Sequence, residues 1–189
     1  MLRYDTRTDL LNAIAERYDY RTYLEIGVKH YENFNAIRIP EKIAVDPVYG
    51  KTFKVTSDQF FKETKWLYPE FDLIFVDGDH RMEPCSRDIL NAWLHMAPGG
   101  LIVVHDVWPK VIDLIGERQE GRKGWCGDVW LAYLLALQNG FSGYTIDCET
   151  GCGIITGFGA TPTKIPDRIT FDAFLEHAEE WLNVKEEIE

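Results

Sequence analysis

Two short apolar runs separated by one helix-length segment constrain the fold of this chain more than any other feature. Leu73 to Val76 and Leu101 to His105 have the length and composition of strands that are covered on both faces. Between them, Pro84 opens a segment with one apolar helical face, and Pro98-Gly99-Gly100 ends it. Strands joined through a helix pair in parallel, so the sequence predicts an α/β fold with helices on both faces of a sheet.

The segments before these runs continue the same alternation. Apolar residues at helical spacing follow Thr8 and Asp9, which suit an N-terminal cap, and they predict an opening helix. Ser57 or Asp58 is expected to cap a later helix. The further strands expected in this part of the chain are Tyr23 to Val28, Lys42 to Asp46 and, more briefly, Phe53 to Thr56.

The last two predicted strands are too close together for a crossover. Tyr144 to Cys148 and Gly153 to Thr156 are separated only by Glu149 to Cys152, which allows a hairpin and forbids a parallel connection. The prediction is therefore a doubly wound, mostly parallel sheet with an antiparallel hairpin strand near its C-terminal end. With 189 residues, the chain is expected to form a single domain that closes with an acidic helix over residues 167–189.

Composition narrows the partners and the compartment. The net charge of -11, from 31 acidic and 20 basic residues, repels a phosphate backbone, so no nucleic-acid partner is expected. The segment from Met1 to Asp9 has no apolar run and no long apolar stretch follows, which predicts a cytoplasmic protein without a membrane partner. The four cysteines form no CxxC pair, which favours reduced thiols over a disulfide framework or a zinc site.

Acidic residues end four of the predicted strands. They are Glu25 with Gly27 two residues later, Asp46, Asp77 in the run Asp77-Gly78-Asp79-His80, and Asp106 after His105. In an open parallel sheet, ligands bind beyond the carboxyl ends of the strands, near the point where strand order reverses. We expect the functional residues of the chain to gather there.

The kind of ligand follows from the glycines and the charges. Gly27 would let a ligand approach the main chain, and Asp46 stands where a carboxylate accepts both hydroxyl protons of an adenosine ribose. A purely structural role for Glu25 and Asp46 is an equal alternative. The turn after Gly27 lacks the GxGxxG spacing of a pyrophosphate site, whereas a cationic sulfonium tolerates a pocket lined by Glu25, Asp46 and Asp77.

The order of these motifs resembles the class I S-adenosylmethionine-dependent methyltransferases, and within them methyltransferase family 24. The most specific stretches are FDLIFVDGDH, a helix with Asp88, LHMAPGGLIVVHD, GDVW at Gly127 to Trp130, and TIDCETGCGII from Thr145 to Ile155. The resemblance covers Tyr23 to about Phe158. It implies a Rossmann-like, seven-stranded sheet and S-adenosylmethionine as the cofactor.

The resemblance also implies roles for individual residues. Glu25 and Gly27 would lie near the methionine end of the cofactor, Asp46 would hold the ribose, and Asp77 would border the reacting centre. Ser57 or Asp58 would approach the adenine. The full set of expected cofactor-binding residues is Glu25, Gly27, Asp46, Ser57, Asp58, Asp77 and Gly78. Tyr31 departs from the family, which usually has a glycine there.

The chemistry of methyl transfer nominates further residues. The protein must hold acceptor, methyl group and sulfur in line, and an oxygen acceptor also loses a proton. His80 and His105 are the expected bases, beside Asp77, although a structural role is as well supported for each histidine. Asp77, Asp79 and Asp106 are alternatively candidates for Mg²⁺, with Asp77 and Asp106 as the expected ligands.

The sequence leaves the acceptor open. A small molecule is expected, with an oxygen of a sugar or another polyhydroxylated metabolite suggested by the resemblance. Arg118, Arg122 and Lys123 lie in a long segment that could close over an acidic acceptor or merely be a solvated loop. Two rival functions remain: a cofactor-binding module without turnover, and an NAD-dependent oxidoreductase on the same kind of sheet.

Overall fold

The computed structural model of the protein describes residues 4–64, 67, 70–116, 124–166 and 168–189. Its strands are β1 (Thr22–Ile26), β2 (Glu41–Val45), β3 (Phe71–Val76), β4 (Met96–His105), β5 (Phe141–Ile146), β6 (Cys152–Phe158) and β7 (Val184–Lys185). Its helices are α1 (Arg7–Tyr18), α2 (Glu32–Ala36), α3 (Ser57–Thr64), α4 (Met82–Leu94), the short 3-10 helix η1 (Ile112–Leu114), α5 (Val129–Gln138) and α6 (Phe171–Trp181).

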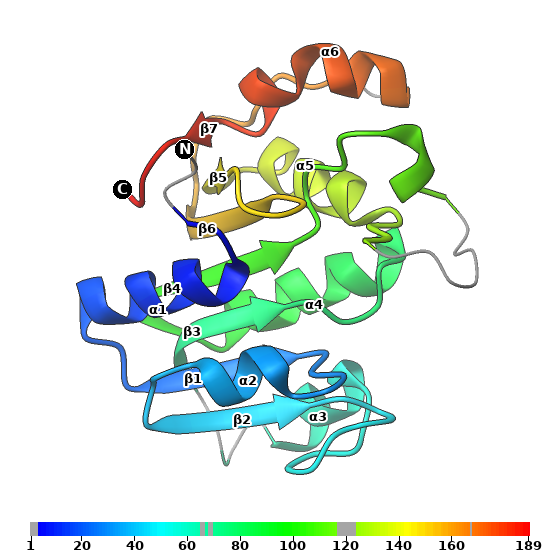
Figure 1. Ribbon diagram of the computed structural model, residues 1–189. Coiled ribbons are helices and arrows are strands. Elements are labelled where there is room, and N and C mark those ends of the chain that lie inside the picture. The colour runs from blue at the N-terminus through cyan, green and yellow to red at the C-terminus, as the bar shows by residue number, and fades with distance from the viewer. Residues whose placement is uncertain (1–3, 65–66, 68–69, 117–123, 167) are drawn as a thin grey trace.

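The strands form one seven-stranded sheet in the order β2-β1-β3-β4-β6-β5-β7 (Figure 1). The first four strands in this order pair in parallel, and β6 runs antiparallel to both β4 and β5. The predicted α/β class, the mostly parallel sheet and the antiparallel hairpin are therefore confirmed. The chain moves outward from β1 to β2 and then returns to the other side of β1, so strand order reverses between β1 and β3.

The membership of the sheet differs from the prediction at two places. Phe53 to Thr56 is not a strand, because only one isolated bridge joins Phe53 to Val45. The seventh strand is instead β7, which pairs in parallel with β5 through Val184 opposite Thr145. The pairing of two residues near the C-terminus depends on long-range packing and leaves no periodic pattern in the sequence.

Two helix caps also lie elsewhere than expected. Thr6, not Thr8 or Asp9, caps α1, and it forms a reciprocal capping box with Asp9. At the start of α3 the hydroxyl of Thr56 accepts the main-chain N–H of Gln59 at 3.2 Å, which is the bond expected of Ser57 or Asp58. Both caps are one to three residues earlier than the apolar periodicity indicated.

Helices cover both faces of the sheet (Figure 1). Alternate side chains of β1 point to opposite faces of the sheet. Leu24 and Ile26 belong to the hydrophobic cluster that includes residues of α3, α4 and α5, and Tyr23 belongs to the hydrophobic cluster that includes residues of α1. Helix α6 packs on α5, where the rings of Trp130 and Phe174 lie 4.5 Å apart. Among the described residues, no helix is long and apolar enough to span a membrane.

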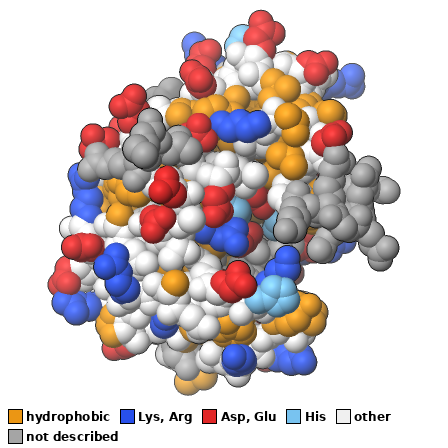
Figure 2. Space-filling model, in the orientation of Figure 1, with side chains coloured by type: hydrophobic (Ala, Val, Ile, Leu, Met, Phe, Trp, Pro, Cys, Tyr) orange, Lys and Arg blue, Asp and Glu red, His pale blue; other side chains and the backbone are white. Residues whose placement is uncertain are grey.

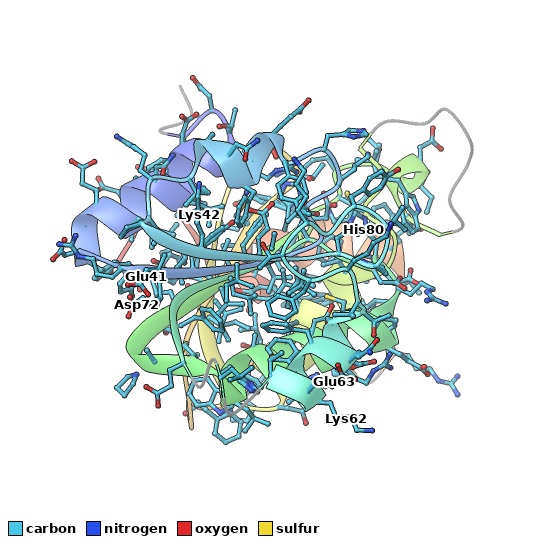
Figure 3. All side chains as sticks on the ribbon, turned by 90° about the horizontal axis from the view of Figure 1, so that it is seen from below. Glu41, Lys42, Lys62, Glu63, Asp72 and His80 are labelled. Carbon is cyan, nitrogen blue, oxygen red and sulfur yellow. The ribbon has the colours of Figure 1, made fainter. Side chains whose placement is uncertain are left out.

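The two ends of the sheet carry different side chains. Figure 3 shows Glu41 and Asp72, near the amino ends of β2 and β3, on one side and His80 at the opposite end. His80 follows β3 by four residues, so it marks the carboxyl end of the parallel strands. This end, at the reversal between β1 and β3, is where a ligand is expected to bind.

Candidate functional site

Gly27 and Asp77 bring the carboxyl ends of β1 and β3 into contact. Gly27 has a φ of +85°, and a Cβ atom there would lie 2.1 Å from the carbonyl oxygen of Asp77. The N–H of Asp77 in turn donates to the carbonyl of Ile26 at 2.9 Å. The glycine is therefore required by the neighbouring strand, whereas the sequence suggested that a ligand required it.

Asp77 is the centre of a group of charged side chains that we call the rim cluster, consisting of Arg7, Asp77, His80, His105, Asp106 and Glu149. The Oδ1 atom of Asp77 lies 3.4 Å from His80 Nε2 and 3.4 Å from His105 Nδ1. Its Oδ2 atom lies 3.5 Å from Arg7 Nη1. Burial by itself raises the pKa of Asp77. This effect is outweighed by the charge of His105, by hydrogen bonds from both histidines and by the charge of Arg7, which together hold the pKa well below its usual value.

Asp106 occupies the end of β4 with a left-handed backbone. Its φ of +64° is rare for a residue other than glycine, and such conformations persist where the surroundings hold them. The Thr150 hydroxyl donates to Asp106 Oδ1, and Cys126 Sγ lies 3.5 Å from the same atom. Asp106 Oδ2 lies 3.4 Å from His80 Nδ1. The turn between β5 and β6 thus helps to orient this carboxylate.

His105 is almost completely buried between three acids and Arg7, whose Nη1 atom lies 3.2 Å from His105 Nδ1. Its Nε2 atom lies 2.8 Å from Glu149 Oε2, and its Nδ1 atom lies 3.4 Å from both Asp77 and Asp106. Burial lowers the pKa of His105, but the charges of Asp106 and Asp77 and the hydrogen bonds to them raise it well above the usual value. The surrounding carboxylates therefore favour the charged form of His105, which neutralises part of the acidic cluster.

His80 is held between a carboxylate and an aromatic ring. Its ring stacks on Trp125, with centroids 5.1 Å apart, and its Nδ1 atom lies 2.7 Å from the Trp125 carbonyl oxygen. That carbonyl only accepts, so Nδ1 carries a hydrogen and Nε2 faces Asp77. Burial lowers the pKa of His80, but the hydrogen bond to Asp77 and the charges of Asp106 and Asp77 raise it overall.

Three members of the rim cluster also have the arrangement of a metal site. One ligand atom from each of Asp77, His80 and Asp106 lies within 4.8 Å of the other two. Carboxylate oxygens and an imidazole nitrogen suit a small divalent cation such as Mn²⁺ or Mg²⁺. The two expected ligands, Asp77 and Asp106, are thus brought together. Asp79 instead pairs with Arg81, whose Nε atom lies 2.9 Å from it.

Part of the rim cluster reaches the surface. The side chains of Arg7 and Glu149 are 33% and 32% exposed. Figure 2 shows acidic, basic and histidine side chains side by side near the middle of one face of the molecule. A ligand can therefore reach the charged groups from solvent, whereas His105 and Asp106 lie beneath them.

Asp46, the residue expected to hold a ribose, already has a full set of partners. Its Oδ1 atom accepts the main-chain N–H groups of Val48 and Tyr49, both at 2.8 Å. Its Oδ2 atom accepts those of Val28 and Lys29, both at 3.2 Å. A carboxylate has about four acceptor positions. Asp46 therefore joins the loops after β1 and β2 to each other, which is the structural role that the sequence left as an alternative.

Glu25 lies beneath the carboxyl end of β1, buried under α2. Its Oε2 atom accepts hydrogen bonds from the Tyr23 hydroxyl at 2.6 Å and the Asn33 amide at 2.9 Å. Burial raises the pKa of Glu25 to about 7, although these hydrogen bonds and Arg7 lower it. The position next to the first strand end was expected, and the hydrogen bonds correspond to the structural role that the sequence left as an alternative.

The raised pKa of Glu25 predicts a specific pH dependence of stability. Its folded pKa lies above the unfolded value, so its contribution is complete below the unfolded pKa and is lost as pH rises through the folded one. As the pH rises from about 5 to about 8, the free energy of unfolding of the wild type should therefore fall by about 2.5 kcal/mol more than that of Glu25→Gln. Urea denaturation at both pH values measures this difference. Glu16→Gln, at an exposed site, is the control, and equal losses in wild type and Glu25→Gln would contradict the prediction.

The two residues expected beside the adenine link neighbouring helices. Ser57 hydrogen-bonds the buried Asp88 of α4, and Asp58 Oδ2 lies 3.1 Å from Arg87 Nε on the same helix. Burial raises the pKa of Asp88 to about 7. A Cβ atom on Gly78 would lie 3.6 Å from Asp88, so the glycine, the aspartate and the start of α3 are close together.

Tyr31, which stands where the resemblance expects glycine, adopts the backbone conformation of a glycine. Its φ is +65°, and its ring is buried against Val28 and Ala44. The Tyr31 hydroxyl accepts the main-chain N–H of Lys51, and the Lys51 ammonium lies 4.5 Å from the ring centroid. Tyr31 is therefore folded into a small core beside β2.

Sequence reasoning missed three of the groups at the site. Arg7 precedes the predicted core, and only the packing of α1 on the sheet brings it to Asp77. Glu149 and Thr150 lie in the hairpin turn within the TIDCETGCGII motif. The acidic residue in that turn was the sequence feature that could have placed them at the site. Arg118, Arg122 and Lys123, considered for closure over an acceptor, lie outside the described residues.

Comparison with known structures supports the fold. The SAH-bound methyltransferase PaMTH1 from Podospora anserina superposes with a TM-score of 0.56 and 17% identity, over 80% of this chain and 77% of that one. The O-methyltransferase TomG from Streptomyces achromogenes, in complex with SAM, gives 0.55 and 16%, over 81% and 80%. At such identities the likeness shows the fold alone.

Two further results concern length and sequence. The chain covers only 58% of the MycE methyltransferase of the mycinamycin biosynthetic pathway, with 86% of its own length, 16% identity and a TM-score of 0.48. No curated protein sequence matches it.

The family model described as a methyltransferase domain matches residues 10–107, which include the strand ends with Gly27, Asp46, Asp77 and Asp106. Because this match covers more than half of the 189 residues, the chain belongs to that family of methyltransferase domains.

Proposed function

We propose that this chain transfers a methyl group from S-adenosylmethionine to an oxygen of a small molecule, a sugar or another polyhydroxylated metabolite. The observation that carries the proposal is the rim cluster, in which two imidazoles and three carboxylates gather at the carboxyl ends of β3 and β4, next to the point where strand order reverses. The SAM in the TomG complex and the SAH in the PaMTH1 complex support the cofactor.

The residues at the carboxyl end of the sheet fit a cationic cofactor. Asp77 stays ionised because its pKa is held low, and Asp106 and Glu149 also have lowered pKa values beside His105. When bound, S-adenosylmethionine supplies a methyl group on a positively charged sulfur, which carboxylates stabilise. We assign Gly27, Asp77 and Gly78 to the methionine end of the cofactor. Glu25, which lies beneath this end of β1, is assigned to the same part of the site.

The adenosine end of the cofactor requires a change of partners. Asp46 would bind the ribose hydroxyls in place of some main-chain N–H groups that it now accepts. Ser57 and Asp58 keep their proposed place beside the adenine, with their side chains joining α3 to α4. Ribose hydroxyls would replace the donors at Asp46 Oδ2 more easily than those at Oδ1, because the hydrogen bonds at Oδ2 are 3.2 Å long and those at Oδ1 are 2.8 Å long.

Of the two histidines, His80 is the better base. Both ring nitrogens of His105 already face acidic side chains and Arg7, so neither is free to reach an acceptor hydroxyl. Burial lowers the pKa of His105, but Asp106 and Asp77 raise it overall, so His105 favours keeping its proton. The Trp125 carbonyl orients His80 and leaves its Nε2 atom on the side of Asp77. We therefore assign removal of the acceptor proton to Nε2 of the neutral form of His80, with Asp77 stabilising the imidazolium that forms.

A second role for the same residues is favoured by their spacing. Asp77, His80 and Asp106 fit a divalent cation, which would acidify an acceptor hydroxyl by coordination. In that case His80 holds the cation and does not act as the base. The two roles differ in a simple measurement, because only the second makes turnover depend on Mg²⁺ or Mn²⁺ and abolishes it with a chelator.

Calorimetric titration of the whole chain with SAM, SAH and NAD tests the proposed function. SAM and SAH should bind at least about 100-fold more tightly than NAD, because the chain lacks the glycine loop that holds a pyrophosphate. With a substrate that the wild type methylates, His80→Gln should form SAH at least about 100-fold more slowly and should bind SAM with unchanged affinity. His177→Gln, on the far helix α6, is the matched control. Tighter binding of NAD would overturn the proposal, and so would SAM binding without turnover on any hydroxylated acceptor.

A further inference from the structure

Two buried thiols lie against each other beneath the hairpin turn that contacts the rim cluster. Cys148 and Cys152 are both fully buried, and the Cys152 thiol hydrogen-bonds the sulfur of Cys148. Ile146 pairs with Cys152 across the hairpin, and the N–H of Gly151 donates to the Cys148 carbonyl at 2.8 Å. The backbone thus holds the two cysteines on facing ends of one tight turn.

The residues between these cysteines are members or neighbours of the site. Glu149 is 2.8 Å from His105 Nε2, and the Thr150 hydroxyl donates to Asp106. Cys152 itself is the β6 residue opposite His105 in the sheet. Every change in the geometry of the turn is therefore transmitted directly to His105 and Asp106.

The turn is docked on the chain that leaves β4. The N–H of Trp108 donates to the Thr150 carbonyl at 2.8 Å, and the N–H of Val107 donates to the Gly151 carbonyl at 3.3 Å. A Cβ atom on Gly151 would lie 2.5 Å from Trp108 Cβ, so the two segments are in close contact. Glu149 also has a left-handed φ of +53°. This arrangement has little room for a different turn conformation.

From this arrangement we infer that Cys148 and Cys152 form a reversible disulfide that switches the rim cluster off. Joining the sulfurs shortens their separation to about 2 Å and imposes a fixed dihedral angle on a turn that has only three residues between them. The shortened turn draws Glu149 away from His105 and Thr150 away from Asp106. Asp106, with its left-handed backbone, loses the hydroxyl that orients it.

The reaction is a thiol–disulfide exchange with a small-molecule disulfide such as oxidised glutathione. Because both thiols are buried, the exchange requires transient opening of the turn. Cys148 then attacks one sulfur of the oxidant and releases one thiol, and Cys152 attacks the mixed disulfide and releases the second. Two S–H bonds are lost, one S–S bond forms, and the two electrons and two protons end on the two thiols of the reduced oxidant. The hydrogen bond from Cys152 lowers the pKa of Cys148, which suits Cys148 as the first nucleophile.

Mass spectrometry of the whole chain, equilibrated with oxidised and reduced glutathione, tests the formation of the bond. Wild type and Cys85→Ser, in which the pair is intact, should each lose two hydrogens and regain them with dithiothreitol. Cys148→Ser and Cys152→Ser should not form an intramolecular bond. Absence of the bond in native wild type, under conditions where the unfolded chain forms it, would overturn the inference.

Hydrogen–deuterium exchange tests the effect on the site without reference to methyl transfer. Oxidation should speed exchange of the Val107 and Trp108 amides at least about 10-fold, because they lose their acceptors in the turn. If SAM binds the reduced chain, its affinity should also fall at least about 10-fold on oxidation and recover on reduction. Unchanged exchange would refute the switch, whereas a reduced chain that exchanges as expected but never binds SAM would refute only the proposed function.

Discussion

Replacing Asp77 by Asn is expected to lower the rate of methyl transfer by at least about 100-fold, the loss typical of a removed charge at a reacting centre. Asp77 lies 3.4 Å from His80 and His105 and 3.5 Å from Arg7, so its replacement removes a carboxylate that all three side chains share. The pKa of both histidines should fall, and His80 becomes a weaker base. SAH formation at saturating SAM measures the loss.

Asp79→Asn is the matched control for this variant. Asp79 carries the same charge two residues further on but pairs with the exposed Arg81, so its replacement should change the rate less than about 2-fold. Titration with Mn²⁺ distinguishes the two roles of Asp77: loss of a Mn²⁺ site in Asp77→Asn supports the cation, and no Mn²⁺ binding in wild type supports His80 as the base. An Asp77→Asn variant that retains half of the wild-type rate would exclude Asp77 from the mechanism.

Asp46→Ala should reduce the free energy of unfolding by about 4 kcal/mol, because it removes the only carboxylate acceptor that the described residues offer to four main-chain N–H groups. The side chain is nearly buried, so water replaces it poorly. Asp46→Asn keeps one oxygen and should lose about half as much. Denaturation in urea at neutral pH measures both values.

Asp58→Ala is the control for Asp46. Asp58 is another aspartate, in a half-exposed ion pair with Arg87, and its removal should cost less than about 1 kcal/mol. If Asp46→Ala is as stable as Asp58→Ala, the four hydrogen bonds do not hold the loops together. SAM affinity of the folded Asp46→Asn variant then tests the ribose role separately, with a loss of about 10-fold expected for an exchanged hydroxyl partner.

The position of the candidate site followed from the sequence, and its internal contacts did not. Strand ends are recognisable because an apolar run stops at an acid, and parallel pairing brings such ends to one side of a sheet. Asp77, His80, His105 and Asp106 were found in this way. Tyr31 was noted as a departure from glycine, but its left-handed backbone and its bond to Lys51 depend on β2 and its loop.

The sequence alone determined the α/β class, the hairpin and the acidic carboxyl end of the sheet, because these depend on periodicity and on spacing along the chain. Tertiary structure decided that Arg7 and Glu149, which are far apart in the chain, meet at Asp77 and His105, and that Asp46 joins two loops. It also replaced an expected third strand by β7. These outcomes are sums of many weak long-range contacts, to which no single short segment of sequence corresponds.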